Sequence, residues 1–136
     1  MAFRPVAQPK PSTKARPKYY DLNLLNLPMP GLVSIFHRIT GVAMFLFLIP
    51  LTLVILQTTL QSEAGFAVWE GYFNNLFVKC ILMGFVWAFM HHLFAGIRYL
   101  LLDLHIGVNK APAQASAKFV LAAGLIATAI FAVRVW

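Results

Sequence analysis

The side chains that could carry redox or proton chemistry in this sequence fall into two short groups, each inside a long apolar block. The members are Ser34, His37 and Arg38 in the first group, and His91, His92, Arg98, Tyr99 and Asp103 in the second. Ionisable and imidazole side chains are costly inside a lipid bilayer, and they persist mainly where they serve an ion, a cofactor or a substrate. Each of these residues is therefore a candidate for a functional site.

His92 is the strongest candidate for a metal-binding residue. Gly84, Ala88, His92 and Gly96 follow one another at intervals of four residues, so they share one side of a helix. Such a histidine lies in a shallow groove where a flat macrocycle can approach the backbone, and neutral imidazole is a good axial ligand for haem iron. The same pattern also suits simple helix–helix packing. His91 is about 100° away around the helix, which favours a packing or hydrogen-bonding role for it.

The first group also has two interpretations. Ser34 and Arg38 are one helical turn apart, with His37 alongside. Arg38 could simply extend its guanidinium to the nearby membrane surface. Alternatively, the guanidinium binds a haem propionate while Ser34 hydrogen-bonds a quinone carbonyl. His92 is roughly 15 Å from the end of its helix, so a macrocycle there would reach toward Arg38 and His37.

Three long apolar blocks must position these residues. Hydrophobic residues make up 60% of the 136 residues and charged residues only 11%, whereas about a quarter of a soluble domain is charged. The blocks cover about residues 32–56, 77–102 and 117–133, and each can cross a hydrocarbon layer of about 30 Å as a helix. The sequence therefore predicts an all-α membrane protein with three transmembrane helices and a polar connection over about residues 103–116.

Two local features modify this plan. Pro50 lies within the first block, where it predicts a kink that neighbouring helices can tolerate. Between the first two blocks, Phe66, Trp69 and Phe73 recur at helical spacing. This spacing predicts a short helix lying in the membrane interface, with its aromatic side in the acyl boundary.

Residues 1–30 form a separate arm rich in proline, which predicts an extended or irregular chain. Its basic residues are Arg4, Lys10, Lys14, Arg16 and Lys18. They suit a cytoplasmic segment near anionic lipid, so the net charge of +7 does not indicate a nucleic-acid partner.

The basic residues also predict the orientation of the chain in the membrane. Arg98, Lys110 and Lys118 flank the second loop, whereas the first has only Lys79, which predicts a cytoplasmic amino terminus and a periplasmic carboxyl terminus. The arm has no amphipathic Arg/Ser pattern, which favours a bacterial inner membrane over a mitochondrial one.

The two groups also carry longer patterns. Residues 34–41 read S-x-x-H-R-x-[ST]-G, residues 92–98 read H-x-x-x-G-I-R with Asp103 following, and the arm contains Arg16-Pro17-Lys18-Tyr19-Tyr20-Asp21-Leu22. With the layout of three spans, these patterns resemble the cytochrome b556 subunits of succinate dehydrogenase over about residues 16–136. Both patterns are specific, and a chance match to the two together is improbable.

The resemblance implies a role for each candidate residue. In that family the haem ligand stands four residues before the glycine of G-I-R, which selects His92 over His91. The resemblance also implies quinone contact by Ser34 and Arg38, and propionate contact by His37 and Arg38. The supporting candidates are His91, Arg98, Tyr99 and Asp103. Tyr99 stands where some members carry another histidine.

The resemblance further implies an assembly. The second axial histidine of haem b comes from a second small anchor subunit, with which the three spans pack into a haem-containing bundle. A flavoprotein subunit and an iron–sulfur subunit lie on the cytoplasmic face, as in respiratory complex II. Electrons from succinate then reach ubiquinone or a related quinone near Ser34 and Arg38.

Three other functions compete with this interpretation. The haem-free quinone-binding anchor of a fumarate reductase has a similar size. A carrier of two haems is suggested by His92 and His105, which are thirteen residues apart, although Asp103 and Gly107 indicate that His105 lies at the membrane edge. A small transporter is disfavoured because the sequence has no internal repeat.

Overall fold

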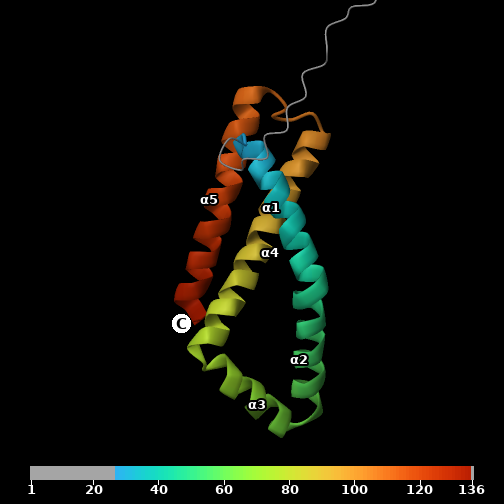
Figure 1. Ribbon diagram of the computed structural model, residues 1–136, viewed down its shortest axis with the longest axis vertical. Helices are drawn as coiled ribbons and strands as arrows, with labels where there is room; N and C mark the ends of the chain where they lie inside the picture. Colours follow the sequence, from blue (N-terminus) through green and yellow to red (C-terminus); the bar gives the residue numbers. More distant parts are fainter. Residues whose placement is uncertain (1–26, 136) are drawn as a thin grey trace, which may run out of the picture.

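The computed structural model describes residues 27–135, and every regular element in that range is helical (Figure 1). The elements are α1 (Met29–Ala43), the π-helical turn η2 (Met44–Leu48), α2 (Ile49–Gln61), α3 (Glu63–Phe73), α4 (Leu76–Asp103) and α5 (Lys110–Val135). The first three form one continuous helical segment. Most of the proline-rich arm lies outside the described residues.

Three of the helical segments are long and apolar enough to cross a membrane. They are Met29–Gln61, Leu76–Asp103 and Lys110–Val135. The shortest has 26 residues, or about 39 Å at 1.5 Å per residue, against a hydrocarbon core of about 30 Å. The prediction of an all-α chain with three such helices is confirmed at the level of length and composition.

The helices extend beyond the predicted membrane spans. The first helix begins at Met29 rather than near residue 32, and α5 begins at Lys110 rather than near residue 117. Pro30 and Pro112 misled the prediction, because both lie in the first turn of a helix, where the backbone N–H groups have no partner inside the helix anyway. The polar connection therefore ends at residue 109, and Met29 and Pro30 belong to the helix rather than to the arm.

The first helix also continues beyond residue 56, where the first span was expected to end, to Gln61. Polar residues are accommodated in this extension because their hydroxyls donate to carbonyls one turn earlier. Thr58 Oγ1 is 2.8 Å from the Val54 oxygen, and Thr59 Oγ1 is 2.7 Å from the Ile55 oxygen.

Pro50 is accommodated by η2. The Ile49 N–H bonds to the Met44 carbonyl five residues back, which makes the wider turn of a π-helix. This turn directly precedes Pro50, whose ring nitrogen has no hydrogen to donate. The irregularity expected at Pro50 is thus present as a π-helical turn.

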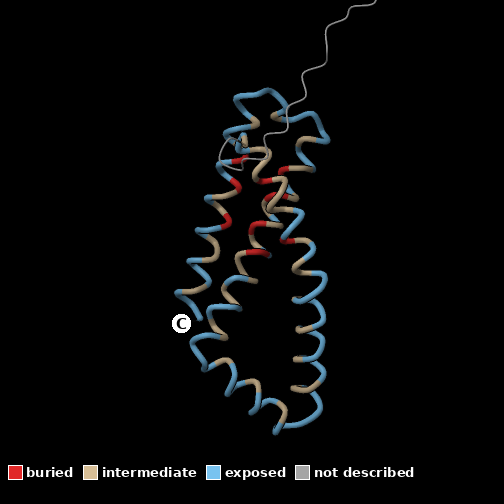
Figure 2. Tube along the Cα trace, in the orientation of Figure 1, coloured by how far each residue is buried: buried red, intermediate tan, exposed pale blue. Residues whose placement is uncertain are grey.

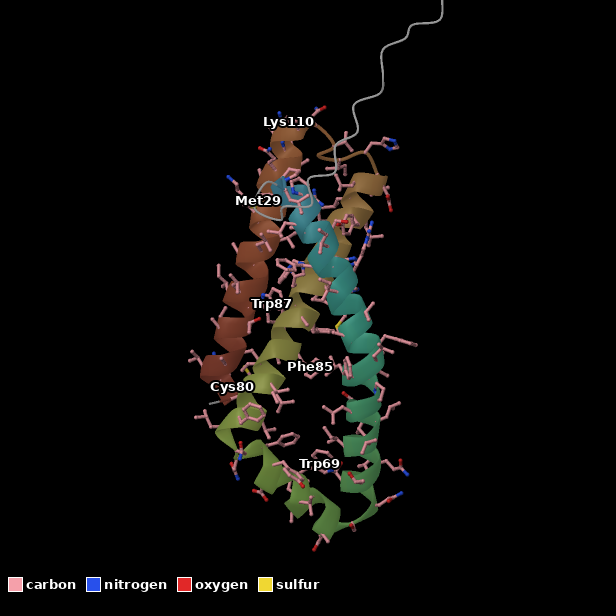
Figure 3. The ribbon with its side chains drawn as sticks, viewed as in Figure 1. Met29, Trp69, Cys80, Phe85, Trp87 and Lys110 are labelled. Carbon is pink, nitrogen blue, oxygen red and sulfur yellow. The ribbon has the colours of Figure 1, made fainter. Side chains whose placement is uncertain are left out.

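The core lies where α1, α4 and α5 converge, at the end of the molecule that contains Met29 and Lys110 (Figures 2 and 3). Its buried hydrophobic residues are Val33, Ala95, Ala117 and Val120. Small residues at such contacts allow helices to approach closely, which is the usual basis of packing in membranes. By contrast, α2 contains no buried residue and runs away from α4 (Figure 1).

The short α3 returns the chain from α2 to α4, as the aromatic spacing predicted for a short helix between the first two spans. Ser62 caps α3, because its Oγ accepts a hydrogen bond of 3.0 Å from the Gly65 N–H. Trp69 Nε1 donates to Thr58 Oγ1 at 2.6 Å, which ties α3 to α2 (Figure 3). A Cβ atom on Gly65 would overlap the Thr58 carbonyl, so the corner needs glycine there.

Candidate functional site

The two candidate groups meet where α1 crosses α4. The ring of His37 stacks on the ring of His92, with centroids 3.9 Å apart and planes inclined by 14°. Tyr99 lies edge-on to His37, with centroids 5.1 Å apart. The structure thus brings together His37, His92 and Tyr99, which were predicted to belong to one joint site.

His92 is anchored to α1 by one ring nitrogen. Its Nδ1 is 3.1 Å from the backbone oxygen of His37 and 3.2 Å from Thr40 Oγ1. No hydrogen bond joins Nε2 to any part of the chain between residues 27 and 135. The imidazole therefore has one bonded nitrogen and one free nitrogen, which is the arrangement typical of a histidine that binds a metal.

The small residues around His92 do not form a single open groove. Ala88 is buried inside the bundle, whereas a Cβ on Gly84 would meet nothing within 4 Å. Residues four apart advance by about 40° around a helix. A series of small residues at this spacing therefore faces one neighbouring helix at one end and a different one at the other. The close approach to His92 comes instead from Gly41 of α1, where an added Cβ would lie 3.0 Å from His92 Cε1. The Gly96 part of the stripe is covered by His37.

His91 occupies a different environment from its neighbour. It is fully buried, with its ring 5.4 Å from Trp87 and 5.9 Å from Phe36 between centroids. Gly124 of α5 packs against its backbone, because an added Cβ there would lie 3.3 Å from His91 Cα. Neither ring nitrogen makes a hydrogen bond within the described chain. Of the two roles predicted for His91, packing or hydrogen bonding, this environment supports packing, and the role itself stays a prediction.

Ser34 and Arg38 lie beside this contact but not in it. Ser34 is half-buried and Arg38 is exposed. The Arg38 side chain borders a shallow hollow of about 400 Å³ whose other lining residues, Ile39, Val42, Ala43 and Phe47, all belong to α1 and η2. Within residues 27–135, Arg38 has no ion-pair partner. No other described helix lines this hollow on α1, so it is accessible from outside the described part of the chain.

Arg98 has a role that the sequence did not suggest. It is buried, and its guanidinium donates to Ser116 Oγ at 2.9 Å and to the Ala113 carbonyl at 3.2 Å. Its Cζ also lies 5.6 Å from the centre of the Tyr99 ring. Arg98 therefore joins the end of α4 to the first turns of α5.

The remaining candidates at this end of α4 are less constrained. The Tyr99 hydroxyl is buried and has no hydrogen-bond partner among the described residues. Asp103 is exposed at the last position of α4. His105 lies beyond the helix, exposed and with a φ of 62°. Such a position outside the helix does not suit a second haem ligand stacked on the same helix as His92.

Thr40 and Gly41 are neighbours of His92 that sequence reasoning missed. Both belong to the pattern at residues 34–41, but neither received a role. Their positions three and four residues after His37 place them on its side of α1. That spacing was a usable signal once His37 itself was a candidate.

Comparison with known proteins identifies the family of the chain. Residues 12–131 match the family described as "Succinate dehydrogenase/Fumarate reductase transmembrane subunit". The succinate dehydrogenase cytochrome b556 subunit of Coxiella burnetii (strain RSA 493 / Nine Mile phase I) is 29% identical over 121 residues, covering 89% of this chain and 97% of that protein. The b556 subunit of Paracoccus denitrificans is 30% identical over 111 residues, covering 82% and 85%. The cytochrome b560 subunit of Porphyra purpurea is 33% identical over 96 residues, covering 69% and 76%.

Proposed function

The chain belongs to the succinate dehydrogenase/fumarate reductase transmembrane subunit family, and from this premise we propose that it binds haem b and helps to form the quinone-reduction site of a succinate:quinone oxidoreductase. It is a multi-pass membrane subunit of that kind of complex. In this role the chain does not oxidise succinate itself. That chemistry belongs to the flavoprotein and iron–sulfur subunits that it anchors.

The contact between His92 and α1 is the observation that carries the haem proposal. With Nδ1 held by the His37 carbonyl, Nε2 is the nitrogen left to bind iron. When bound, haem b would supply one-electron redox chemistry close to the quinone site. A histidine of the second anchor subunit would supply the other protein ligand to the iron.

Three further groups suit the polar edge of a haem. The buried Tyr99 hydroxyl lacks a partner within the described chain and can donate to a carboxylate. The His37 ring lies beside it. Arg38 supplies a charged guanidinium without an ion-pair partner in residues 27–135, and guanidinium–carboxylate contacts are strong. We assign His37 and Arg38 to the propionates and Tyr99 to a supporting contact.

Ser34 and Arg38 form the quinone-binding part of the proposal. Their side chains are one turn apart on α1, half-buried and exposed respectively. Hydrogen-bond donors placed at the quinone oxygens stabilise the negative charge that develops during reduction. Ser34 would bond one carbonyl, while Arg38 would lie near both the quinone and the haem propionates.

The exposed apolar surface supports a second anchor subunit as the partner. Ile39, Val42 and Phe47 beside Arg38 are each more than half exposed. In the bilayer this surface meets either lipid or another helix, and a shared haem requires another helix. The sequence predicted a cytoplasmic arm over residues 1–30 and an anchor over residues 31–136. Because α1 begins at Met29, we propose the same two-part chain with the anchor beginning at residue 29.

An optical spectrum of the purified complex tests the haem proposal. We expect a b-type band in the dithionite-reduced minus oxidised spectrum of the wild type, its loss in His92→Ala, and its retention in the matched variant His91→Ala. Succinate-dependent dye reduction by membranes reports whether the complex has assembled. The loss of the b-type band in His92→Ala therefore supports the assignment only if the variant membranes still reduce the dye. A band that survives His92→Ala overturns the ligand assignment. A wild type without any b-type band favours the haem-free anchor of a fumarate reductase.

A further inference from the structure

We infer that Thr40 and the backbone carbonyl of His37 are positioning groups that hold the His92 imidazole as the Nδ1–H tautomer, with Nε2 carrying the lone pair. This inference rests on the proposed haem function. It goes beyond that function because it states what fixes the ligand before iron binds, and it assigns a role to Thr40.

The hydrogen-bond partners of Thr40 determine the direction of its own hydroxyl. Thr40 Oγ1 is 2.8 Å from the Phe36 carbonyl oxygen and 3.1 Å from the His37 carbonyl oxygen. Carbonyl oxygens only accept hydrogen bonds, so the hydroxyl hydrogen points to one of them. Thr40 therefore presents an oxygen lone pair to His92 Nδ1, which is 3.2 Å away.

The second neighbour of Nδ1 has the same polarity. The His37 carbonyl oxygen is 3.1 Å from Nδ1 and is also only an acceptor. With acceptors on both sides, Nδ1 must carry the hydrogen. With the hydrogen on Nε2 instead, the lone pair of Nδ1 would face the lone pairs of both oxygens. That arrangement is unfavourable because the ring is partly buried and water cannot compensate fully.

Gly41 and His37 limit the remaining freedom of the ring. An added Cβ on Gly41 would lie 3.0 Å from His92 Cε1, so this edge of the ring leaves little room for a side chain on α1. The His37 ring covers one face at 3.9 Å between centroids. Hydrogen bonds at Nδ1, the limited space beside Cε1 and an aromatic ring on one face together set the direction of Nε2.

This arrangement affects the chemistry of a bound iron. An acceptor that bonds the free N–H of a ligating histidine makes the imidazole more basic and favours the oxidised metal. Removal of the Thr40 oxygen leaves one acceptor instead of two. The reduced state is then favoured, and the midpoint potential of the haem shifts to a more positive value.

A redox titration of the haem in the intact complex tests this inference, with Thr40→Val as the variant and Thr40→Ser as the matched control. We expect Thr40→Val to retain haem and titrate at a more positive potential, and Thr40→Ser to titrate as the wild type does. An unchanged potential in Thr40→Val overturns the inference. An equal shift in both variants also overturns it, because Thr40→Ser keeps the hydroxyl and the shift would then not depend on that group. If Thr40→Val does not assemble, Thr40→Ala, which removes the hydroxyl without added bulk, is read in the same way.

A second measurement addresses the position of the ring. Gly41→Ala should displace His92 and alter the low-spin electron paramagnetic resonance signal of the oxidised haem. A wild-type signal in Gly41→Ala would contradict the contact at Cε1. Failure of the haem proposal itself is distinguishable, because it appears as a b-type band that is absent from the wild type or persists in His92→Ala.

Discussion

The adjacent residues His91 and His92 have different environments because consecutive residues of a helix point about 100° apart around its axis. His91 points into the contact among α1, α4 and α5 and is fully buried, whereas His92 meets α1 with a hydrogen bond at Nδ1. The same rotation separates Arg98, which bonds to α5, from Tyr99, which lies against His37. At the scale of residues, the site is therefore defined by which neighbour each helix position faces. The side-chain chemistry of the two histidines is identical.

Ser34→Ala should weaken quinone binding while leaving the haem in place. Loss of one hydrogen bond costs about 1 kcal/mol, which corresponds to roughly a fivefold increase in the apparent KM for a soluble quinone analogue. The measurement compares quinone-dependent turnover with dye-linked succinate oxidation, which does not require the site. Thr52→Ala is the control, because its hydroxyl lies on the same continuous helix but donates only to the Leu48 carbonyl. Equal KM values for Ser34→Ala and the wild type would remove Ser34 from the quinone site.

At the scale of elements, the sequence predicted the helices well and their ends poorly. Long apolar runs identify membrane helices because the bilayer requires about 20 such residues. The helices continue past the predicted spans through Pro30 and Pro112, which lie in first turns, and through Thr58 and Thr59, whose hydroxyls bond within the helix. Proline and threonine have low helix propensity, yet the position of each proline and the hydrogen bonds of each threonine make these residues compatible with a helix. Composition alone does not contain that information.

The corner between α2 and α3 gives a test with a matched control in the same helix. Gly65→Ala would force a Cβ onto the Thr58 carbonyl, whereas a Cβ on Gly71 meets nothing within 4 Å. We expect Gly65→Ala to destabilise the corner by about 1–3 kcal/mol and Gly71→Ala to be neutral or stabilising by up to about 1 kcal/mol. The thermal midpoint of the detergent-purified complex should therefore fall only for Gly65→Ala. Equal midpoints for the two variants would mean that α3 does not pack on α2 as described.

At the scale of the whole molecule, the buried contacts gather at one end, where α1 begins, α4 ends and α5 begins (Figures 1 and 2). The stack of His37 on His92 lies in this region. The sequence placed both residues in membrane helices, but it did not predict the stack. A contact between side chains of two helices depends on how the helices cross and rotate, and this information is not carried by the hydrophobic pattern of either helix.

The orientation of the chain in the membrane decides which side of the bilayer this end faces. Five basic residues precede the first span, and Arg98, Lys110 and Lys118 flank the connection between α4 and α5, whereas only Lys79 lies near the α2–α4 connection. Basic residues in short loops are retained on the cytoplasmic side. The end that contains His37 and Arg38 should therefore face the cytoplasm.

Reporter fusions provide the test of this orientation. Alkaline phosphatase, which is active only after export, should be active when fused after Trp136 and inactive when fused after Asn109. Green fluorescent protein should show the opposite pattern, which serves as the internal control for expression. The reverse result at both positions would place the Ser34–Arg38 region on the side away from the cytoplasm, where a cytoplasmic iron–sulfur subunit could not deliver electrons to it. The proposed quinone site would then have to lie elsewhere in the chain, even if His92 still bound haem.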